Sequence, residues 1–428
     1  MSAEHSRIAT VWKMEAPRLI AALTRKLGDL GLAEDAAQDA LVAALEHWPR
    51  DGQPEKPGAW LLRAAERKGL DAIRHWSMAA RHHVALGREA DEAAPTNAPE
   101  AAALRSEAEG GLGDDTLRLL FMTCHPALSA ESQLALVLKV LAGLSTAEIA
   151  RAFLQTEATI AQRLVRAKRQ LAEAKVPFEL PQGSALTARL PAVLHAIYLL
   201  FNEGYTATSG SDWLRPALCD EALRLARSVA ALLPQQPEAQ GLLALLELQA
   251  ARNAARTAAD GTPILLADQD RRRWNRLLIQ RGLAALARAE QLGGADGAYA
   301  LQAAIAAGHA RAARFAETDW PHIAACYARL EAVSPSPVVT LNRAVAVSFA
   351  EGAAAALPLV QALRATSALA QYHLLPTVEG DLLARLGRPA EAAVAFREAA
   401  SLTRNTREAA LLQQRVAECE AQCAAVPT

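Results

Sequence analysis

Extended runs in which Val, Ile or Thr alternate with polar residues are almost absent from this chain, and their absence argues against sheet-containing folds. Long segments are dominated by Ala and Leu, while aromatic residues make up only 4% of the 428 residues, a composition typical of packed helices. The chain is also too long for one hydrophobic core, since domains usually contain roughly 100 to 200 residues. We therefore expect an all-α protein with several domains.

Charge is segregated along the chain, although the formal net charge is only -1. Residues 29–46 contain five acids and neither Lys nor Arg, whereas residues 60–88 contain six Lys or Arg against two acids. Binding of phosphates depends on local Lys and Arg, so the neutral average does not exclude nucleic acid as a partner. The segregation indicates that different segments bind different partners.

The cysteines and the apolar segments bear on the compartment of the protein. The five cysteines are scattered, with no C-x-x-C motif and no Cys/His cluster at zinc spacing. The N-terminal residues lack an apolar stretch of signal-peptide length, and we find no run of ~18 apolar residues that would span a membrane. We expect a cytoplasmic protein with no membrane anchor, no bound metal and no cofactor.

Two interruptions divide the chain. Residues 89–113 contain six acids and one Arg among Pro and Gly, which predicts a flexible acidic linker, and residues 176–189 form a shorter second linker. The remaining segments are predicted helical modules: residues 1–88, 114–175, 190–292 and 293–428.

The last module shows signs of an internal repeat. Gly352 and Gly387 lie at comparable points of two Ala-rich segments, about 35 residues apart. Leu386-Gly387 and Ala392-x3-Phe396 also match fragments of the tetratricopeptide pattern, whose period is about 34 residues. We expect helical repeats of the tetratricopeptide type in this module.

Residues 129–171 carry the pattern of a helix-turn-helix. Gly143 is placed to end one helix, and Ser145 with Glu148 forms the S-x-x-E capping box that begins the next. Thr156 is placed to cap a third helix. The sequence therefore predicts two short helices joined by a turn, the second of which would be a recognition helix.

The predicted recognition helix has one apolar and one basic face. The apolar stripe is Ile160, Leu164 and Leu171, and the opposite face carries Gln162, Arg166 and Arg169, with Arg163 at its flank. Guanidinium groups bind phosphates and guanine edges in the major groove, and Gln can read adenine. The alternative is an ordinary helical hairpin with a solvated basic face.

Residues 57–83 form a second basic helical segment. Its predicted core stripe is Leu62, Ala65, Gly69, Ala72, Ile73 and Trp76, and its other side carries the candidate DNA-binding residues Trp60, Arg63, Arg67, Arg74 and His75. An aromatic ring among cations suits single-stranded DNA, because bases stack on the ring while cations follow the backbone. The alternative is a solvated amphipathic helix with Trp60 against a neighbouring element.

Residues 32–48 form an acidic helical segment. Leu41, Ala44, Leu45 and Trp48 are its predicted buried stripe, and Asp35, Asp39 and Glu46 share the outward face. DNA would repel this face, so it suits a basic protein surface. A merely solvated face is the alternative.

These three segments, in this order, resemble the sigma-70 family of RNA polymerase sigma factors, specifically the extracytoplasmic-function class. Residues 33–48 resemble region 2.2, which docks on the clamp coiled coil of the largest polymerase subunit. Residues 60–75 resemble regions 2.3 and 2.4, which open and read the -10 element, and residues 143–171 resemble region 4.2, which reads the -35 element. The resemblance implies that Asp35, Asp39 and Glu46 bind core polymerase.

The rest of the chain is similar to a subgroup of these sigma factors with a long C-terminal extension that ends in tetratricopeptide-like repeats. The similar segments include residues 202–210 and 265–279. The resemblance implies a regulatory extension in place of a membrane anti-sigma factor. We expect a regulatory protein or ligand as the partner of this extension. The resemblance also suggests that the acidic linker occupies polymerase channels that later hold RNA, where it would mimic RNA. The alternative is that the linker is a plain spacer.

The chain departs from the family pattern at three places. Glu66-Arg67 stands where the family commonly has Arg-Asn, and Leu154 stands where the helix-turn-helix corner usually has Gly. The predicted recognition helix also carries apolar residues where polar or basic ones are frequent: Ala158, Ala161 and Val165.

Three functions remain open at the level of sequence. The first is promoter-specific initiation with core polymerase, and the second is a helix-turn-helix regulator with a sensing repeat domain. The third is an enzyme in the extension, for which the polar candidates are Asn202, Glu203, Tyr205, Asp268, Asp270 and His309. No nucleophile with a base accompanies them, so we expect no catalytic residues.

Overall fold

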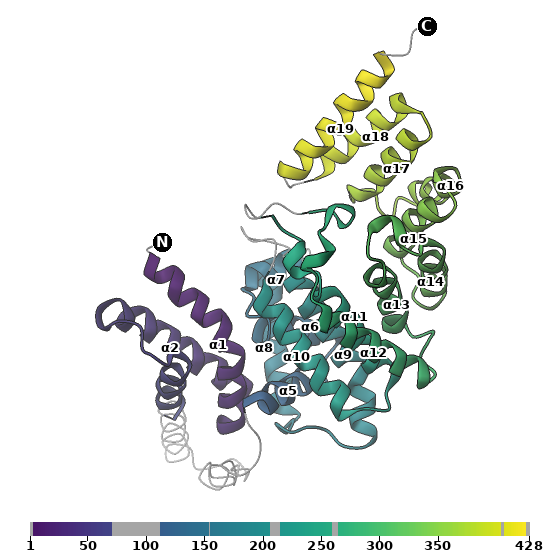
Figure 1. Ribbon diagram of the computed structural model, residues 1–428. Coiled ribbons are helices and arrows are strands. Elements are labelled where there is room, and N and C mark those ends of the chain that lie inside the picture. The colour runs from purple at the N-terminus through teal and green to yellow at the C-terminus, as the bar shows by residue number, and fades with distance from the viewer. Residues whose placement is uncertain are drawn as a thin grey trace, which may run out of the picture. The chain divides into compact units, whose positions relative to one another are not determined.

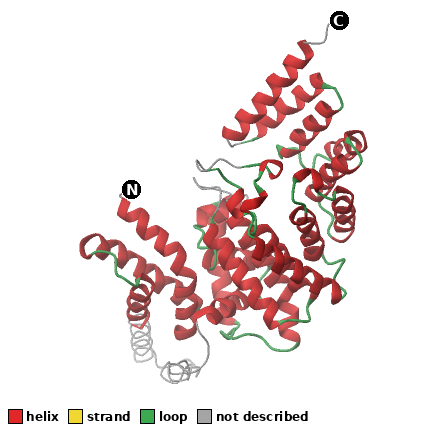
Figure 2. Ribbon diagram, in the orientation of Figure 1, coloured by secondary structure: helices red, strands yellow, loops and turns green. Residues whose placement is uncertain are grey.

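The computed structural model describes residues 3–70, 112–153, 155–205, 215–258, 264–403 and 406–424, and every regular element in these ranges is a helix (Figure 2). The predicted all-α class is confirmed. The chain divides into two compact units, residues Met1–Ser228 and Val229–Thr428, which are described separately.

In the described part of the first unit, three N-terminal helices precede a larger group. The N-terminal helices are α1 (Ala3–Leu27), α2 (Leu30–Asp51) and a third helix that covers residues 57–70 of the described chain. The later helices are α5 (Leu112–Thr123), α6 (Ala130–Val140), α7 (Thr146–Ala152), α8 (Glu157–Glu173), α9 (Ser184–Tyr205) and α10 (Pro216–Leu232), the last of which continues into the second unit.

Helix α2 is closed at both ends and packs against α1 through small residues. The side chain of Asp29 caps it by accepting a hydrogen bond from the backbone N–H of Leu32 at 2.8 Å. Its buried face is Leu30, Ala33, Glu34, Ala36, Ala37, Ala40, Ala44 and Trp48. Of the four residues predicted to be buried, Ala44 and Trp48 are buried, whereas Leu41 and Leu45 are only half-buried. The helix packs against α1 through the alanines of the neighbouring stripe instead.

Helix α9 corrects one expectation from the sequence. It is long and apolar enough to cross a membrane, whereas the sequence analysis found no such run. In the structure α9 packs against α5 and α6, and nine of its residues are buried, Glu203 among them. These contacts are those of a core helix, and the buried carboxylate of Glu203 is paired with Arg215 at 3.3 Å.

The second unit is a succession of helices that each pack against the next (Figure 1). They are α11 (Pro237–Ala250), α12 (Arg276–Gln291), α13 (Ala298–Arg311), α14 (Trp320–Val333), α15 (Pro337–Ala350), α16 (Ala353–Ala365), α17 (Leu374–Arg385), α18 (Pro389–Leu402) and α19 (Thr406–Ala424). Neighbour-to-neighbour packing of this kind defines a helical-repeat protein.

The predicted repeat is present in the turns and the core. Gly352 and Gly387 have positive φ angles of 100° and 70°, and each lies in the short turn between two packed helices, α15–α16 and α17–α18. Phe396 of α18 is fully buried, and Gly380 of α17 lies so close to it that an added Cβ would be 2.7 Å from the ring. Gly352 and Gly387 therefore occupy equivalent positions of two repeats. Phe396 and Gly380 form the close contact between α18 and α17.

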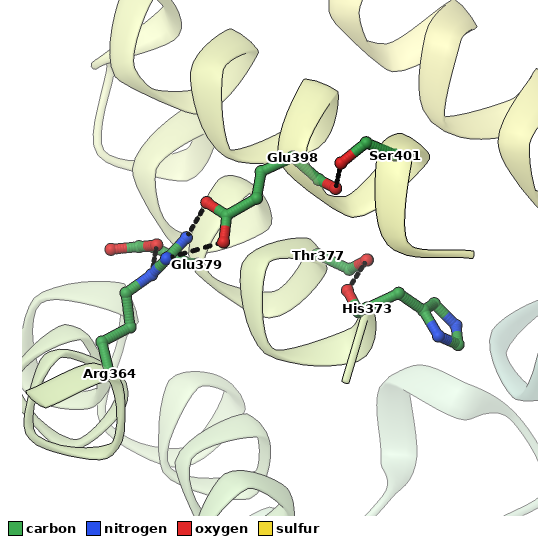
Figure 3. A network of polar contacts seen from close by, with 6 residues as sticks. All are labelled: Arg364, His373, Thr377, Glu379, Glu398 and Ser401. Carbon is green, nitrogen blue, oxygen red and sulfur yellow. Dashed lines mark hydrogen bonds and ion pairs between the residues drawn. The ribbon is translucent and has the colours of Figure 1, made fainter. Parts of the chain in front are cut away.

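Ion pairs link successive repeats at the repeat spacing. Arg364 of α16 pairs with Glu379 of α17 and donates from Nη2 to Glu398 of α18 at 2.7 Å (Figure 3). Arg415 of α19 similarly binds Asp381 of α17 at 2.6 Å. The separations from Arg364 to Glu398 and from Asp381 to Arg415 are both 34 residues, which is one tetratricopeptide period.

Candidate nucleic-acid interface

The three helices α6 to α8 are delimited by the caps that the sequence predicts. Gly143 has a φ of 65° just past the end of α6, and the N–H of Leu144 donates back to the carbonyl of Leu138 at 3.0 Å. The capping box is complete, because Glu148 N–H donates to Ser145 Oγ at 3.2 Å and Ser145 N–H donates to Glu148 Oε2 at 2.8 Å. These caps fix the angle at which α7 leads into α8.

Helix α8 presents the two faces that its pattern predicts. Thr156 caps it by accepting from the N–H of Thr159 at 3.2 Å. Ile160, Leu164, Ala167 and Leu171 are buried, while Gln162, Arg166 and Arg169 are exposed. Arg169 binds Glu173 at 2.6 Å, and this hydrogen bond raises the pKa of its guanidinium. Arg166 forms no ion pair or hydrogen bond among the described residues, so of the cations on α8 it is the one most available to a ligand.

Arg163 lies in a different setting from its three neighbours. Its side chain is only 16% exposed, and its Nη2 pairs with Glu131 of α6 at 2.6 Å. The guanidinium also lies over the ring of Phe153, 5.4 Å from the centroid. The sequence places Arg163 at the flank of the basic face, and in the structure that flank braces α8 against α6.

The outward face of α8 also holds the apolar residues that depart from the family pattern. Ala158, Ala161 and Val165 are exposed, and Val165 is 62% exposed. Small apolar groups beside Arg can contact the methyl group of thymine in a major groove. Leu154, at the corner between α7 and α8, lies outside the described residues.

The acidic face of α2 is fully presented to solvent. Asp35, Asp39 and Glu46 are all exposed, at positions that share one side of the helix. None of the three forms an ion pair among the described residues. The face is therefore an unpaired cluster of negative charge carried by a helix whose opposite side is firmly packed.

Glu34, next to this face, behaves differently. It is buried and pairs with Lys168 of α8 at 3.0 Å and with Lys139 of α6 at 3.8 Å. Arg25 of α1 pairs with the buried Asp115 of α5 at 3.3 Å. Sequence analysis missed these pairs because Glu34 and Lys168 are 134 residues apart and no local pattern joins them.

The basic segment after α2 is partly described. Trp60 is half-buried and packs edge-on against Trp48, with ring centroids 5.5 Å apart, and His47 lies on it at 6.4 Å. Packing against a neighbour was one of the two alternatives for Trp60. Arg63 and Arg67 are exposed, and Arg74 and His75 lie outside the described residues.

The core stripe of this segment differs in part from the prediction. Ala65 and Gly69 are buried as expected, whereas Leu61 is buried in place of Leu62. Ala72, Ile73 and Trp76 lie outside the described residues, as do residues 89–111 of the predicted linker. Leu62 is half-buried, one position away from the stripe that packs on the core.

Three of the six polar residues that suggested an enzyme, Glu203, Asp270 and His309, have partners within the fold. In the first unit Glu203 pairs with Arg215. In the second unit Asp270 caps the short helix η3 (Arg271–Arg273) and binds Arg272 at 2.9 Å. His309 packs edge-on against Trp320 at 5.2 Å. Each of these contacts gives its residue a role in stabilising the fold.

His309 gives the second unit a pH dependence. Burial, together with the nearby charges of Arg252 and Arg271, lowers its pKa from 6.5 to about 4. The unfolded chain therefore binds a proton at this imidazole between pH 6.5 and 4 while the folded chain does not, so stability falls as the pH falls through that window. We expect α13 to lose about 1 to 2 kcal/mol of protection against local opening between pH 7 and pH 5.

Hydrogen exchange of the α13 amides, corrected for the intrinsic effect of pH, measures this loss. The variant His309→Gln has no group that titrates here and is expected to show a smaller dependence. Equal pH dependences in the two proteins would contradict the assignment.

Comparisons with known proteins agree with the order of these elements. A family model described as Sigma-70 region 2 matches residues 11–77, and one described as Sigma-70, region 4 matches residues 118–171. A family of unknown function, DUF6596, matches residues 189–290. The first two matches cover the acidic face of α2 and the outward face of α8, and the third covers the start of the extension.

One curated relative and one solved structure extend over nearly the whole chain. An uncharacterized protein of Rhizobium meliloti (strain 1021) is 44% identical over 411 residues, which are 96% of this chain and 95% of the relative. The crystal structure of the yeast Tom70 covers 98% of this chain and 85% of its own at 10% identity, with a TM-score of 0.32.

Proposed function

The chain belongs to the sigma-70 family of RNA polymerase sigma factors, as a member of the extracytoplasmic-function type with a C-terminal extension, and from this premise we propose how it works. The protein binds core RNA polymerase through α2, directs initiation at specific promoters, and is regulated through its extension. One observation carries the proposal: an unpaired acidic face on α2 and an exposed basic face on α8 occur in the two segments that match regions 2 and 4.

The acidic face of α2 supports polymerase binding. Asp35, Asp39 and Glu46 are exposed and unpaired among the described residues, so a basic partner surface meets their full charge. We assign this face to the clamp coiled coil of the largest polymerase subunit, as the family resemblance implies. The body of α2 stays packed on α1 through its alanines, which keeps the face rigid.

Promoter DNA is assigned to two surfaces. Gln162, Arg166 and Arg169 of α8 enter the major groove of the -35 element, and Arg163 supports them through its contact with α6. Trp60, Arg63, Arg67, Arg74 and His75 are assigned to the -10 element. Because the ring of Trp60 packs on Trp48, the exposed Arg63 and Arg67 are the members of this group best placed to follow a DNA backbone.

Replacement of Arg166 tests the -35 assignment. We expect Arg166→Ala to weaken binding to -35 duplex DNA by about 1 to 3 kcal/mol if the guanidinium reads a base edge, and by a similar amount on every sequence if it contacts only phosphate. Binding to a panel of -35 variants at fixed salt distinguishes the two cases. Arg7→Ala removes an exposed arginine from α1 and is the matched control. Unchanged affinity on every duplex would refute both cases.

We place the protein in the cytoplasm, where core polymerase and the promoter are found. The functional modules are residues 1–88 and 114–175, joined by the linker 89–113, and the extension is residues 190–292 and 293–428 after the linker 176–189. The repeats in the extension support a role in binding a regulatory protein or ligand, because helical repeats expose extended surfaces.

A second candidate function is a simple transcriptional regulator that binds DNA through α6 to α8 and senses a signal through its repeats. The helix-turn-helix caps would serve either function equally well. The two proposals differ at α2, because a simple regulator has no need of an exposed acidic face that binds core polymerase. Direct binding to core polymerase therefore separates them.

A further inference from the structure

A cleft of about 550 Å³ lies in the second unit between the start of α12 and the end of α13. Its wall is made by the short segment that follows η2 (Leu266–Asp268), by η3, and by the chain that leaves α13. Five arginines line it, against a single carboxylate: Arg271, Arg272, Arg276, Arg311, Arg314 and the acid Asp270. Its volume falls within the range of small-molecule sites, which are roughly 300 to 1,000 Å³.

Among the residues that the structure describes, the carboxylates near this cleft do not balance its arginines. Asp270 binds Arg272, and Glu317, outside the cleft, binds Arg314. Arg276 and Arg311 form no ion pair or hydrogen bond among the described residues. Arg271 lies within the influence of Glu317, and with Arg276 and Arg311 it places three guanidinium groups at a cleft whose lining holds one carboxylate, an arrangement that attracts an anion.

Arg271 is held in place by the protein and is not a mobile surface cation. Its Nη1 donates to the carbonyls of His309 and Ala312, at 2.6 and 2.7 Å, and its guanidinium lies 5.0 Å from the ring centroid of the buried Trp274. These contacts join η3 to the end of α13, the two walls of the cleft. Burial and the nearby charge of Arg252 lower the pKa of Arg271, as expected where positive charges converge.

The cleft is shaped for a small molecule more than for a nucleic acid. Its arginines converge on one hollow, whereas a nucleic-acid surface spreads its cations along the path of a backbone. Between them lie the apolar side chains of Ile279 and Phe315, which can cover the organic part of a ligand. Guanidinium forks bind phosphate oxygens in pairs, so a phosphoryl group matches the chemistry best.

We propose that this cleft binds a small phosphate-bearing molecule, with Arg276 and Arg311 as its direct ligands and Arg271 holding the two walls together. In the sequence this segment is distinguished by its similarity to the sigma-factor subgroup over residues 265–279 and by the polar residues Asp268 and Asp270, with His309 further along the chain. The proposal stands independently of the sigma-factor assignment, since it concerns binding to the extension alone.

Calorimetric titration of the full-length chain with inorganic pyrophosphate tests the proposal at constant ionic strength. We expect one saturable site per chain. The double variant Arg276→Gln/Arg311→Gln is expected to weaken binding by about tenfold or more, because two charge-assisted hydrogen-bonding groups are lost. The control Arg281→Gln removes an exposed arginine from the same helix, outside the cleft, and is expected to bind as the original chain does.

Three results would overturn the proposal. They are the absence of saturable pyrophosphate binding, an equal loss of affinity in the Arg281→Gln control, and displacement of bound pyrophosphate by a short DNA duplex, which would assign the cleft to nucleic acid. A parallel titration with citrate tests the chemistry of the anion, since tighter binding of citrate would replace the phosphoryl assignment with a carboxylate one.

Discussion

Reversal of charge at Asp35 and Asp39, in the double variant Asp35→Lys/Asp39→Lys, is expected to reduce binding to core RNA polymerase by at least roughly a hundredfold. Both carboxylates are exposed, so the change converts attraction to a basic partner into repulsion at two points of one face. The fold should be unaffected, because the buried side of α2 is formed by other residues. Fluorescence anisotropy with labelled protein and core polymerase measures the affinity.

The matched control is the double variant Glu4→Lys/Glu55→Lys. It changes the net charge of the same module by the same amount at two exposed positions outside α2. We expect it to bind core polymerase as the original chain does. If the two double variants lost affinity equally, general charge and not the face of α2 would govern binding.

The second large effect concerns the repeats. We expect Phe396→Ala to destabilise the α17–α19 end of the chain by about 3 to 5 kcal/mol, the usual cost of removing a buried aromatic side chain. Phe396 is fully buried, Gly380 lies against its ring, and the guanidinium of Arg415 lies over it at 4.8 Å. Both contacts are lost together with the buried ring, and the cavity lies between helices that have few other neighbours.

Hydrogen exchange of the full-length chain, followed in α17 to α19, measures this destabilisation. Val394→Ala, on the same helix at a position that is 59% exposed, is the control and should stay within about 0.5 kcal/mol of the original chain. Equal protection in the two variants would mean that Phe396 does not hold α17 and α18 together.

The features that the sequence predicted well depend on interactions between residues three or four positions apart. Ser145 and Glu148 meet within one turn, and Thr156 meets Thr159, so a capping pattern is sufficient to locate both helix starts. The buried stripe of α8 follows from helical periodicity in the same way. The repeat glycines were predictable because a turn with positive φ restricts the residue type.

The features that the sequence could not predict depend on distant partners. In the sequence Arg163 looks like the other arginines of α8, and only the structure shows that it pairs with Glu131 of α6. Trp60 had two alternatives, and the position of Trp48 decides where its ring packs. The burial of Glu34 among acidic neighbours likewise follows from Lys139 and Lys168, which lie far along the chain.

The cleft in the extension illustrates a third case. The run of arginines at residues 271–273 is visible in the sequence, but it does not say which cations are neutralised. Only the structure separates Arg272, which binds Asp270, from Arg276 and Arg311, which line the cleft and form no ion pair with any described residue. The sequence thus shows which charged residues a site contains, but only the structure shows which of them are neutralised.

In vitro transcription tests the central claim most directly. Core RNA polymerase and a library of fragments from the genome that encodes this protein are incubated with the full-length chain, with Asp35→Lys/Asp39→Lys, or with no added protein. The account predicts that only the full-length chain produces transcripts that begin at a shared set of promoters, with related -10 and -35 elements. Transcripts that are the same in all three reactions would contradict it.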